Sequence, residues 1–289
     1  MFALLAFAAG VLRAQVAEMP MALEKNLPLV QVRLNGSAPL WFILDSAAAG
    51  LVVDRGRAHE LGLRLAGEGI SSGSGGAQAV GLVEGVTVDI GGVKIQPPRA
   101  ITFDFAALKF EHRVEGIIGF PLFGSYVVEI DYPGLKARVW NKEEYRVPAG
   151  AKVLRMWMTT GPVVRGTLKV KGKAPLEAVV QLDTGSAHVL TVTTPFVDRH
   201  GLLEAAEELK PGQTLGFGGA AVDMVGRIEE VSVGPMVAEK PEVRLSRQTV
   251  GEFGSERNYV ANAGGALFKG YRLTFDIAGE RLMVERPGM

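Results

Sequence analysis

The chain has 289 residues, enough for two ordinary domains, and 47% of them are hydrophobic. Lysine plus arginine and aspartate plus glutamate each total 31, so the net charge is zero. A nucleic-acid partner normally requires a clustered basic surface, and we therefore expect none. The absence of cysteine excludes a thiol nucleophile, a disulfide framework and a thiolate metal site. The 37 glycines among valine and threonine favour short strands joined by tight turns.

The chain begins with an apolar run, residues 2–12 (FALLAFAAGVL), followed by Arg13 and Ala14. This length is typical of the core of a secretory signal peptide, with cleavage after Ala14. We therefore predict a signal peptide and leader over residues 1–20 and an exported protein, periplasmic or secreted. The alternative is a hydrophobic first strand or helix of the mature fold. Neither this run nor any later segment is long enough to span a bilayer, so we expect no stable membrane insertion.

The rest of the chain contains two copies of one β-rich pattern. In each copy, an alternating segment leads through a glycine turn into an apolar segment that ends in an aspartate. The segments are VQVRL and LWFIL before Asp45, and GTLKV and AVVQL before Asp183. Alternation with a period of two predicts half-buried strands, and the glycine predicts a hairpin turn. Residues 45–52 then overlay residues 183–190 without a gap.

The correspondence continues to the end of each half. A short helical segment follows in both copies, and then a strand and a turn. The last block runs from Gly119 to Asp131 in the first half and from Gly264 to Asp276 in the second. We therefore predict two copies of one lobe, residues 21–150 and 151–289, joined near residues 141–150.

The repeated motif resembles the lobe of aspartic proteases, including the bacterial retropepsin-like and pepsin-like proteins. The resemblance rests on residues 183–186 (DTGS) after an apolar strand, and on residues 115–119 (EGIIG) near the end of the first lobe. It covers nearly all of residues 25–287. It implies an all-β, bilobal acid-protease fold with two duplicated β-barrel-like lobes, short helices and a central cleft. It also implies an aspartic endopeptidase that works as a monomer, an intramolecular pseudo-dimer of lobes.

The same resemblance makes Asp45 and Asp183 the catalytic pair. Two carboxyl groups at close range do not both ionise easily, so one activates a water while the other keeps its proton and polarises the scissile carbonyl. This chemistry needs no cofactor and no metal. The substrate would be a peptide or protein in extended conformation, held by strand-like backbone pairing.

Further residues would support this pair. The hydroxyls of Ser46 and Thr184 would brace the two loops against each other. Gly185 would permit a tight turn and donate its amide, and two later glycines would pack beneath the loops. Residues 67–85 fall where the family has a mobile flap over the substrate, and residues 215–219 form the matching loop of the second lobe. The complete supporting set is Ser46, Ala47, Thr184, Gly185, Ser186, Gly119 and Gly264.

Ala47 stands where the family has glycine, and this departure leaves an alternative open. The chain is then a catalytically weakened or inactive peptide-binding protein on the same fold. Two other interpretations have less support. Residues 69–73 match the G-x-S-x-G elbow of serine hydrolases, but that elbow requires a strand before it and a helix after it. The four histidines show no zinc-binding spacing.

Overall fold

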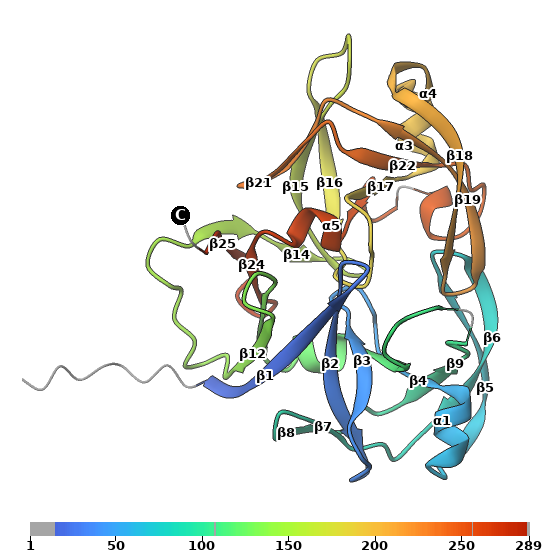
Figure 1. Cartoon of the computed structure of the whole chain (residues 1–289), viewed down its shortest axis with the longest axis vertical. Coiled ribbons are helices and arrows are strands. Elements are labelled where there is room, and N and C mark those ends of the chain that lie inside the picture. Colours follow the sequence, from blue (N-terminus) through green and yellow to red (C-terminus); the bar gives the residue numbers. More distant parts are fainter. Residues whose placement is uncertain (1–14, 107, 256, 288–289) are drawn as a thin grey trace, which may run out of the picture.

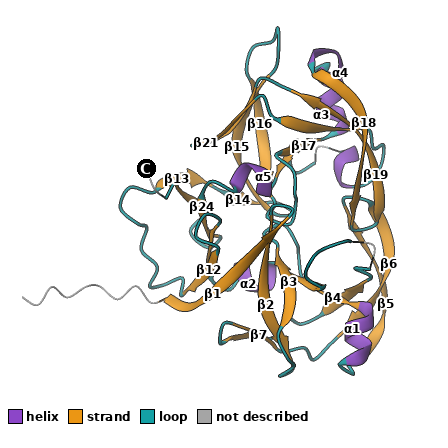
Figure 2. Ribbon diagram, viewed as in Figure 1, coloured by secondary structure: helices purple, strands orange, loops and turns teal. Residues whose placement is uncertain are grey.

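The computed structural model describes residues 15–106, 108–255 and 257–287, and it shows a two-lobed, mainly β protein with short helices (Figures 1 and 2). The first half of the chain builds the lower lobe of Figure 1 and the second half the upper lobe. The predicted all-β, bilobal class is confirmed. Within the described residues, no helix is both long and apolar enough to cross a membrane.

The first lobe contains twelve strands and two short helices in the described part of the chain. They are β1 (Gln15–Glu24), β2 (Leu27–Leu34), β3 (Leu40–Leu44), β4 (Leu51–Asp54), α1 (Arg55–Glu60), β5 (Leu65–Gly73), β6 (Gly76–Val83), β7 (Val88–Ile90), β8 (Val93–Ile95), β9 (Ala100–Phe103), β10 (Val114–Ile118), α2 (Phe120–Phe123), β11 (Val127–Asp131) and β12 (Lys136–Trp140).

The second lobe repeats this order with three differences: two short strands precede its first hairpin, a small helix follows its first α-helix, and a 3-10 helix precedes β23. Its elements are β13 (Lys152–Arg155), β14 (Trp157–Met158), β15 (Pro162–Lys169), β16 (Leu176–Leu182), β17 (Leu190–Val192), α3 (Thr194–Arg199), α4 (Leu202–Ala205), β18 (Glu207–Gly216), β19 (Gly219–Arg227), β20 (Glu230–Val233), β21 (Met236–Glu239), β22 (Glu242–Ser246), the 3-10 helix η1 (Glu252–Gly254), β23 (Ala261–Ala263), α5 (Gly265–Phe268), β24 (Arg272–Asp276) and β25 (Arg281–Glu285).

The start of the fold corrects the predicted leader. The apolar run and the predicted cleavage site after Ala14 lie outside the described residues. β1, however, begins at Gln15 and pairs antiparallel with β12, from Gln15 opposite Trp140 to Pro20 opposite Lys136. Residues 15–20 therefore belong to the first lobe rather than to a leader, because they supply one edge of a sheet.

Each lobe inserts one late strand between two early ones. In the first lobe, β10 lies parallel to β3 on one side and antiparallel to β4 on the other. In the second lobe, β23 lies in the same way between β16 and β17. Since Asp45 follows β3 and Asp183 follows β16, both aspartates leave their sheets at equivalent places.

The registers also correct the gapless overlay of the two motifs. Leu51 pairs with Ile118 in the first lobe, and Leu190 pairs with Ala263 in the second. Leu51 and Leu190 are therefore equivalent, and the loop after Asp183 is one residue longer than the loop after Asp45. The local sequence does not reveal this difference, because no turn residue in it fixes where the next strand begins.

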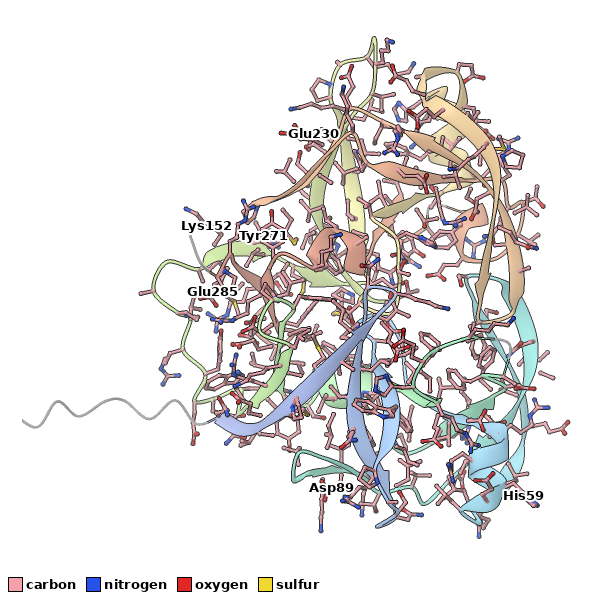
Figure 3. All side chains as sticks on the ribbon, viewed as in Figure 1. His59, Asp89, Lys152, Glu230, Tyr271 and Glu285 are labelled. Atoms are coloured by element: carbon pink, nitrogen blue, oxygen red, sulfur yellow. The ribbon has the colours of Figure 1, made fainter. Side chains whose placement is uncertain are left out.

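The lobes are joined by a shared antiparallel sheet in the order β13, β25, β24, β11, β12, β1. At its centre β11 pairs with β24, and Glu129 lies opposite Thr274, its equivalent in the other lobe. Such a pairing places a pseudo-twofold axis between the lobes. Figure 3 marks Lys152 and Glu285 near the β13–β25 edge of this sheet.

The repeated aspartates at the ends of β11 and β24 are turn residues. Asp131 accepts a hydrogen bond from the Gly134 amide at 2.9 Å, and Asp276 accepts one from the Gly279 amide at 2.8 Å. This is a frequent role of aspartate after a strand. Asp131 and Asp276 therefore close turns of the sheet between the lobes.

The contact between β11 and β24 gives a test of how much the shared sheet stabilises the fold. Ile130 is fully buried beside the pseudo-twofold axis, whereas Val153 on the edge strand β13 is 51% exposed. We expect Ile130→Ala to lower the free energy of unfolding by about 2–5 kcal/mol. Val153→Ala should change it by about 0.5 kcal/mol or less. Urea denaturation of both variants measures the difference, and equal effects would contradict a core role for this contact.

Candidate active site

Asp45 and Asp183 meet where the two lobes come together. The Asp45 amide donates to the Ile118 carbonyl at 3.0 Å, and the Asp183 amide donates to the Ala263 carbonyl at 2.9 Å. The two carboxyl groups share a side-chain hydrogen bond. Both side chains keep a partly solvent-accessible surface. The structure thus brings the two predicted residues into direct contact and leaves them within reach of water.

The neighbouring hydroxyls connect the two loops across the lobes. Thr184 Oγ1 donates to the Leu44 carbonyl at 2.7 Å and accepts from the Ser46 amide at 2.9 Å. Ser46 Oγ donates to the Leu182 carbonyl at 2.8 Å and accepts from the Thr184 amide at 3.1 Å. Both side chains are buried. Four reciprocal hydrogen bonds therefore fix the position of one aspartate loop relative to the other.

The carboxyl groups receive different sets of hydrogen bonds. Asp45 Oδ1 accepts from the backbone amides of Ala47 at 2.8 Å and Ala48 at 3.0 Å. Asp183 Oδ1 accepts from the Gly185 amide at 2.9 Å, and its Oδ2 accepts from the Asn262 side-chain amide at 2.8 Å. Donors of this kind stabilise a carboxylate. Apart from the hydrogen bond between the two carboxyls, Asp45 is thus held by backbone amides, and Asp183 by one backbone amide and one side chain.

Ala47 replaces glycine without cost to the local geometry. Its φ is not in the left-handed region, where alanine would be strained. Its amide reaches Asp45 as the Gly185 amide reaches Asp183. The same replacement of glycine by alanine would not be tolerated in the second lobe, because a Cβ on Gly185 would lie 2.2 Å from Asp45 Oδ2. The glycine position is therefore sterically strict only in the second lobe.

Gly119 and Gly264 lie against the two aspartate loops. A Cβ on Gly119 would lie 2.1 Å from the Ala48 carbonyl oxygen, and one on Gly264 would lie 2.5 Å from the Ser186 carbonyl oxygen. The following amides, of Phe120 and Gly265, donate to the same two carbonyls at 2.8 Å. Each lobe thus supports its loop with one glycine and one amide, and Ser186 contributes backbone only to these contacts.

Burial and mutual charge raise the pKa values of the pair. Burial, and after it the neighbouring charge of Asp45, raise the pKa of Asp183 from its ordinary value of 3.8 to about 8. Burial also raises the pKa of Asp45, against the lowering effect of the Ala47 and Ala48 amides. A shared proton is the expected state of such a pair. Asp183 is the better proton holder.

Three residues near the pair were missed by the sequence reasoning. Asn262 lies on β23 and contacts Asp183 directly. Glu252 on η1 interacts electrostatically with both aspartates and accepts a hydrogen bond from the Tyr259 hydroxyl. Burial raises the pKa of Glu252. The only available signal for Asn262 was its place before Ala263–Gly264, where the first lobe has isoleucine.

Two hairpins cover the pair, one from each lobe. The β5–β6 hairpin begins two residues before the predicted flap and overlaps most of it, and β18–β19 is its counterpart; the two tips meet at the right of Figure 1. The Gly75 amide donates to the Phe217 carbonyl at 2.8 Å, and a Cβ on Gly75 would lie 2.2 Å from the Gly219 carbonyl oxygen. Residues 69–73 belong to β5, so the G-x-S-x-G pattern lies within a flap strand and forms no nucleophile elbow.

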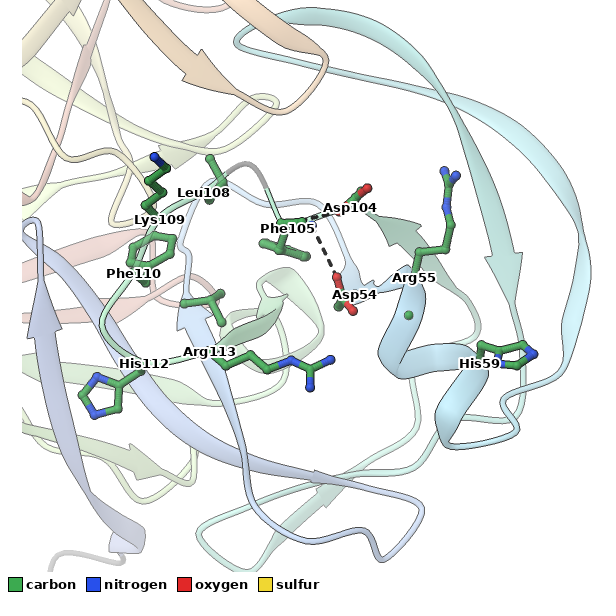
Figure 4. A pocket seen from close by; sticks show the side chains of 13 residues that line it. Asp54, Arg55, His59, Asp104, Phe105, Leu108, Lys109, Phe110, His112 and Arg113 are labelled. Atoms are coloured by element: carbon green, nitrogen blue, oxygen red, sulfur yellow. Dashed lines mark hydrogen bonds between the residues drawn. The ribbon is translucent and has the colours of Figure 1, made fainter.

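A large cavity lies elsewhere, beside α1 in the first lobe (Figure 4). It has a volume of about 820 Å³, and neither Asp45 nor Asp183 lines it. Asp54 at its wall caps α1 by accepting from the Arg57 amide at 2.9 Å, and it also accepts from the Phe105 amide at 3.3 Å. Asp54 therefore serves the local fold.

Comparison with known proteins agrees with this geometry. Residues 30–122 match the family model described as "Aspartyl protease". Over these residues the chain is similar to aspartyl proteases, as the predicted resemblance implied. The match covers the first aspartate loop, the first flap and Gly119. A comparison of the chain with curated proteins finds no match.

The hydroxyl brace makes a prediction about stability. Thr184→Ala leaves the Leu44 carbonyl without its donor and the Ser46 amide without its acceptor, both in a buried setting. Each such group costs about 1–3 kcal/mol, so we expect a loss of about 2–4 kcal/mol in the free energy of unfolding. Thr184→Ser retains the hydroxyl and is the matched control. Equal urea midpoints for the alanine and serine variants would contradict the brace.

The raised pKa of Asp183 predicts a pH-dependent stability. Because this pKa is about 8 in the folded chain and near 3.8 when unfolded, its favourable contribution is complete below about pH 4 and is lost as the pH rises through 8. Asp183→Asn removes the ionisation, so the variant should gain stability over the wild type toward pH 8, on the order of 5 kcal/mol.

Thermal unfolding at pH 4, 6 and 8 measures this effect. Asp89→Asn, at the far end of the first lobe in Figure 3, is the control and should follow the wild type at each pH. A difference between Asp183→Asn and wild type that does not grow with pH would refute the assignment of the raised pKa to Asp183.

Proposed function

We propose that this chain is an active aspartic endopeptidase that hydrolyses peptide bonds with a water held between Asp45 and Asp183. The observation that carries the proposal is the direct hydrogen bond between two carboxyl groups at equivalent positions of the two lobes. A pair that shares one proton can act as base and acid in the same step. Since one chain supplies both aspartates, we expect the active species to be a monomer.

The surroundings of the two carboxyls suggest which one begins as the base. Two backbone amides stabilise the charge on Asp45, and the pKa of Asp183 is raised to about 8. Asp45 would take a proton from the water as the water oxygen attacks the peptide carbonyl carbon. In the same step Asp183 gives its proton to the carbonyl oxygen, and a diol forms. The C–N bond of this diol then breaks as the proton held by Asp45 moves to the leaving nitrogen, and Asp183 takes a proton from one diol hydroxyl, so a carboxyl group forms and the pair returns to its starting protonation. No covalent enzyme intermediate forms.

The substrate would enter as an extended strand beneath the two flaps. Each flap is a hairpin whose backbone can pair with a peptide, and this mode of recognition depends on backbone groups more than on side chains. We further infer that the protein is exported. This inference rests on the apolar run at residues 2–12, whose length is typical of the core of a signal peptide.

The alternative function is peptide binding without cleavage, and Ala47 was its support. Ala47 has unstrained backbone geometry, and its amide contacts Asp45 as a glycine amide would. That feature therefore no longer favours an inactive site over an active one. A direct test of activity separates the two functions.

We expect Asp45→Asn and Asp183→Asn each to reduce kcat/KM for a peptide mixture by about 100-fold or more, because each removes one partner of the acid–base pair. Asp89→Asn is the matched control and should retain wild-type activity. Cleavage is measured by mass spectrometry between pH 3 and pH 8. Peptide binding by the wild type without any cleavage would support the alternative, and full activity of either site variant would defeat the proposed mechanism.

A further inference from the structure

The two lobes carry different side chains at three equivalent strand positions next to the pair. In the first lobe, Ile117 on β10 lies between Ile43 on β3 and Val52 on β4. In the second lobe, Asn262 on β23 lies between Gln181 on β16 and Thr191 on β17. The first set is entirely apolar and the second entirely polar.

The first-lobe set is part of an apolar wall. Ile43 and Val52 pack in one cluster with Phe105 and Val114, and further aromatic and aliphatic side chains of the loop before β10 cover it. The cluster also receives Phe217 from the tip of the second flap, whose ring stacks on Phe103 with centroids 4.9 Å apart. This side of the site is therefore suited to an apolar side chain.

The second-lobe set presents hydrogen-bond acceptors. Asn262 is 2% exposed and Gln181 is 1% exposed. Among the described residues, neither Asn262 Oδ1 nor Gln181 Oε1 has a hydrogen-bond partner, whereas the Asn262 amide nitrogen is used by Asp183. Buried carbonyl oxygens without a donor are rare and costly in a folded protein. Here two of them lie side by side next to a reactive carboxyl.

Glu252 adds a negative charge to the same region. It interacts electrostatically with both aspartates, and the Tyr259 hydroxyl donates to it. Within the part of the chain that the structure describes, no lysine or arginine forms an ion pair with Glu252. The loop that carries Glu252 is joined to the first flap, because the Gln248 side chain donates to the Ser74 carbonyl at 3.1 Å. Glu252 is thus held at the covered side of the site.

We propose that the second-lobe side of the site binds a lysine or arginine side chain of the peptide, while the first-lobe side takes an apolar side chain across the scissile bond. The inference rests on the proposed function. A cationic side chain carries several N–H donors and no acceptor, so it supplies what the two free carbonyl oxygens and the Glu252 carboxylate lack. A neutral apolar side chain would leave the two amide oxygens without a donor and Glu252 without a cation.

The test compares matched peptides that differ only in lysine or norleucine at each position flanking the cleaved bond. We expect the wild type to prefer lysine on one side by about 10- to 100-fold in kcat/KM, the range of a charged hydrogen bond, and norleucine on the other side. Glu252→Gln should reduce the lysine-to-norleucine ratio about tenfold or more. Gln181→Ile, which installs the residue type of the first lobe, should reduce it as well.

The exposed Glu239, in the same lobe, provides the control Glu239→Gln, which should leave the ratio unchanged. Thermal unfolding shows whether each variant is folded, and the Glu252→Gln result stands alone if Gln181→Ile does not fold. An unchanged ratio in Glu252→Gln, or a wild type that cleaves without preferring lysine, would overturn the inference. Cleavage of no peptide would instead defeat the proposed function.

If no peptide is cleaved, binding can still be measured. Isothermal titration of the lysine and norleucine peptides into the Asp45→Asn variant measures selectivity without chemistry. Tighter binding of the lysine peptide, lost in the double variant with Glu252→Gln, would support the cation site. Equal binding of the two peptides would reject it.

Discussion

The fold depends on holding two carboxyl groups in contact although their charges repel each other. The duplicated lobe places each aspartate at the end of an equivalent strand, and the pairing of β11 with β24 relates the two strands by a pseudo-twofold axis. This alone does not fix the distance between the carboxyls. The buried hydroxyls of Ser46 and Thr184 do so, because each bonds a main-chain carbonyl and an amide of the opposite loop. Because these hydrogen bonds end on main-chain atoms, the two loops cannot separate by a side-chain rotation alone. The protein therefore relieves the repulsion by raising pKa values and retaining a proton, rather than by separating the groups.

The symmetry of the backbone does not extend to the chemistry of the site. Both aspartates receive an amide from the residue two positions later, so their loops are alike. Their surroundings then diverge, because the strand inserted beside each aspartate ends in a different residue pair. In the first lobe this strand adds only apolar contacts. In the second it adds Asn262, which bonds Asp183 directly. A symmetric scaffold with asymmetric walls can give the two carboxyls separate roles, as a reaction with one base and one acid requires.

Much of this was readable from the sequence, because the main signals are local. The repeated apolar strand that ends in aspartate predicts both members of the pair, and the hydroxyl residues after them predict the brace. The contributions of Asn262 and Glu252 were not predicted, since each comes from a distant segment that only the sheet topology brings to the pair. The extra residue after Asp183 was missed for a related reason: strand register is set by β23, more than 70 residues away in sequence. The overlap of the predicted leader with β1 follows the same rule, because its partner β12 lies over 100 residues further on.

The flaps link the cover of the site to its electrostatics. Their tips join through main-chain contacts close enough to require glycine at Gly75 and Gly218. Each hydrogen bond between them contributes only about 0.5–1.5 kcal/mol net, so an entering peptide can replace these bonds with its own backbone at little cost. Burial is the main cause of the raised pKa values of the two carboxyls. A peptide that takes the place of the tip contacts keeps bulk water out while it brings its carbonyl to the pair. Peptide binding would therefore preserve the shared proton that hydrolysis needs.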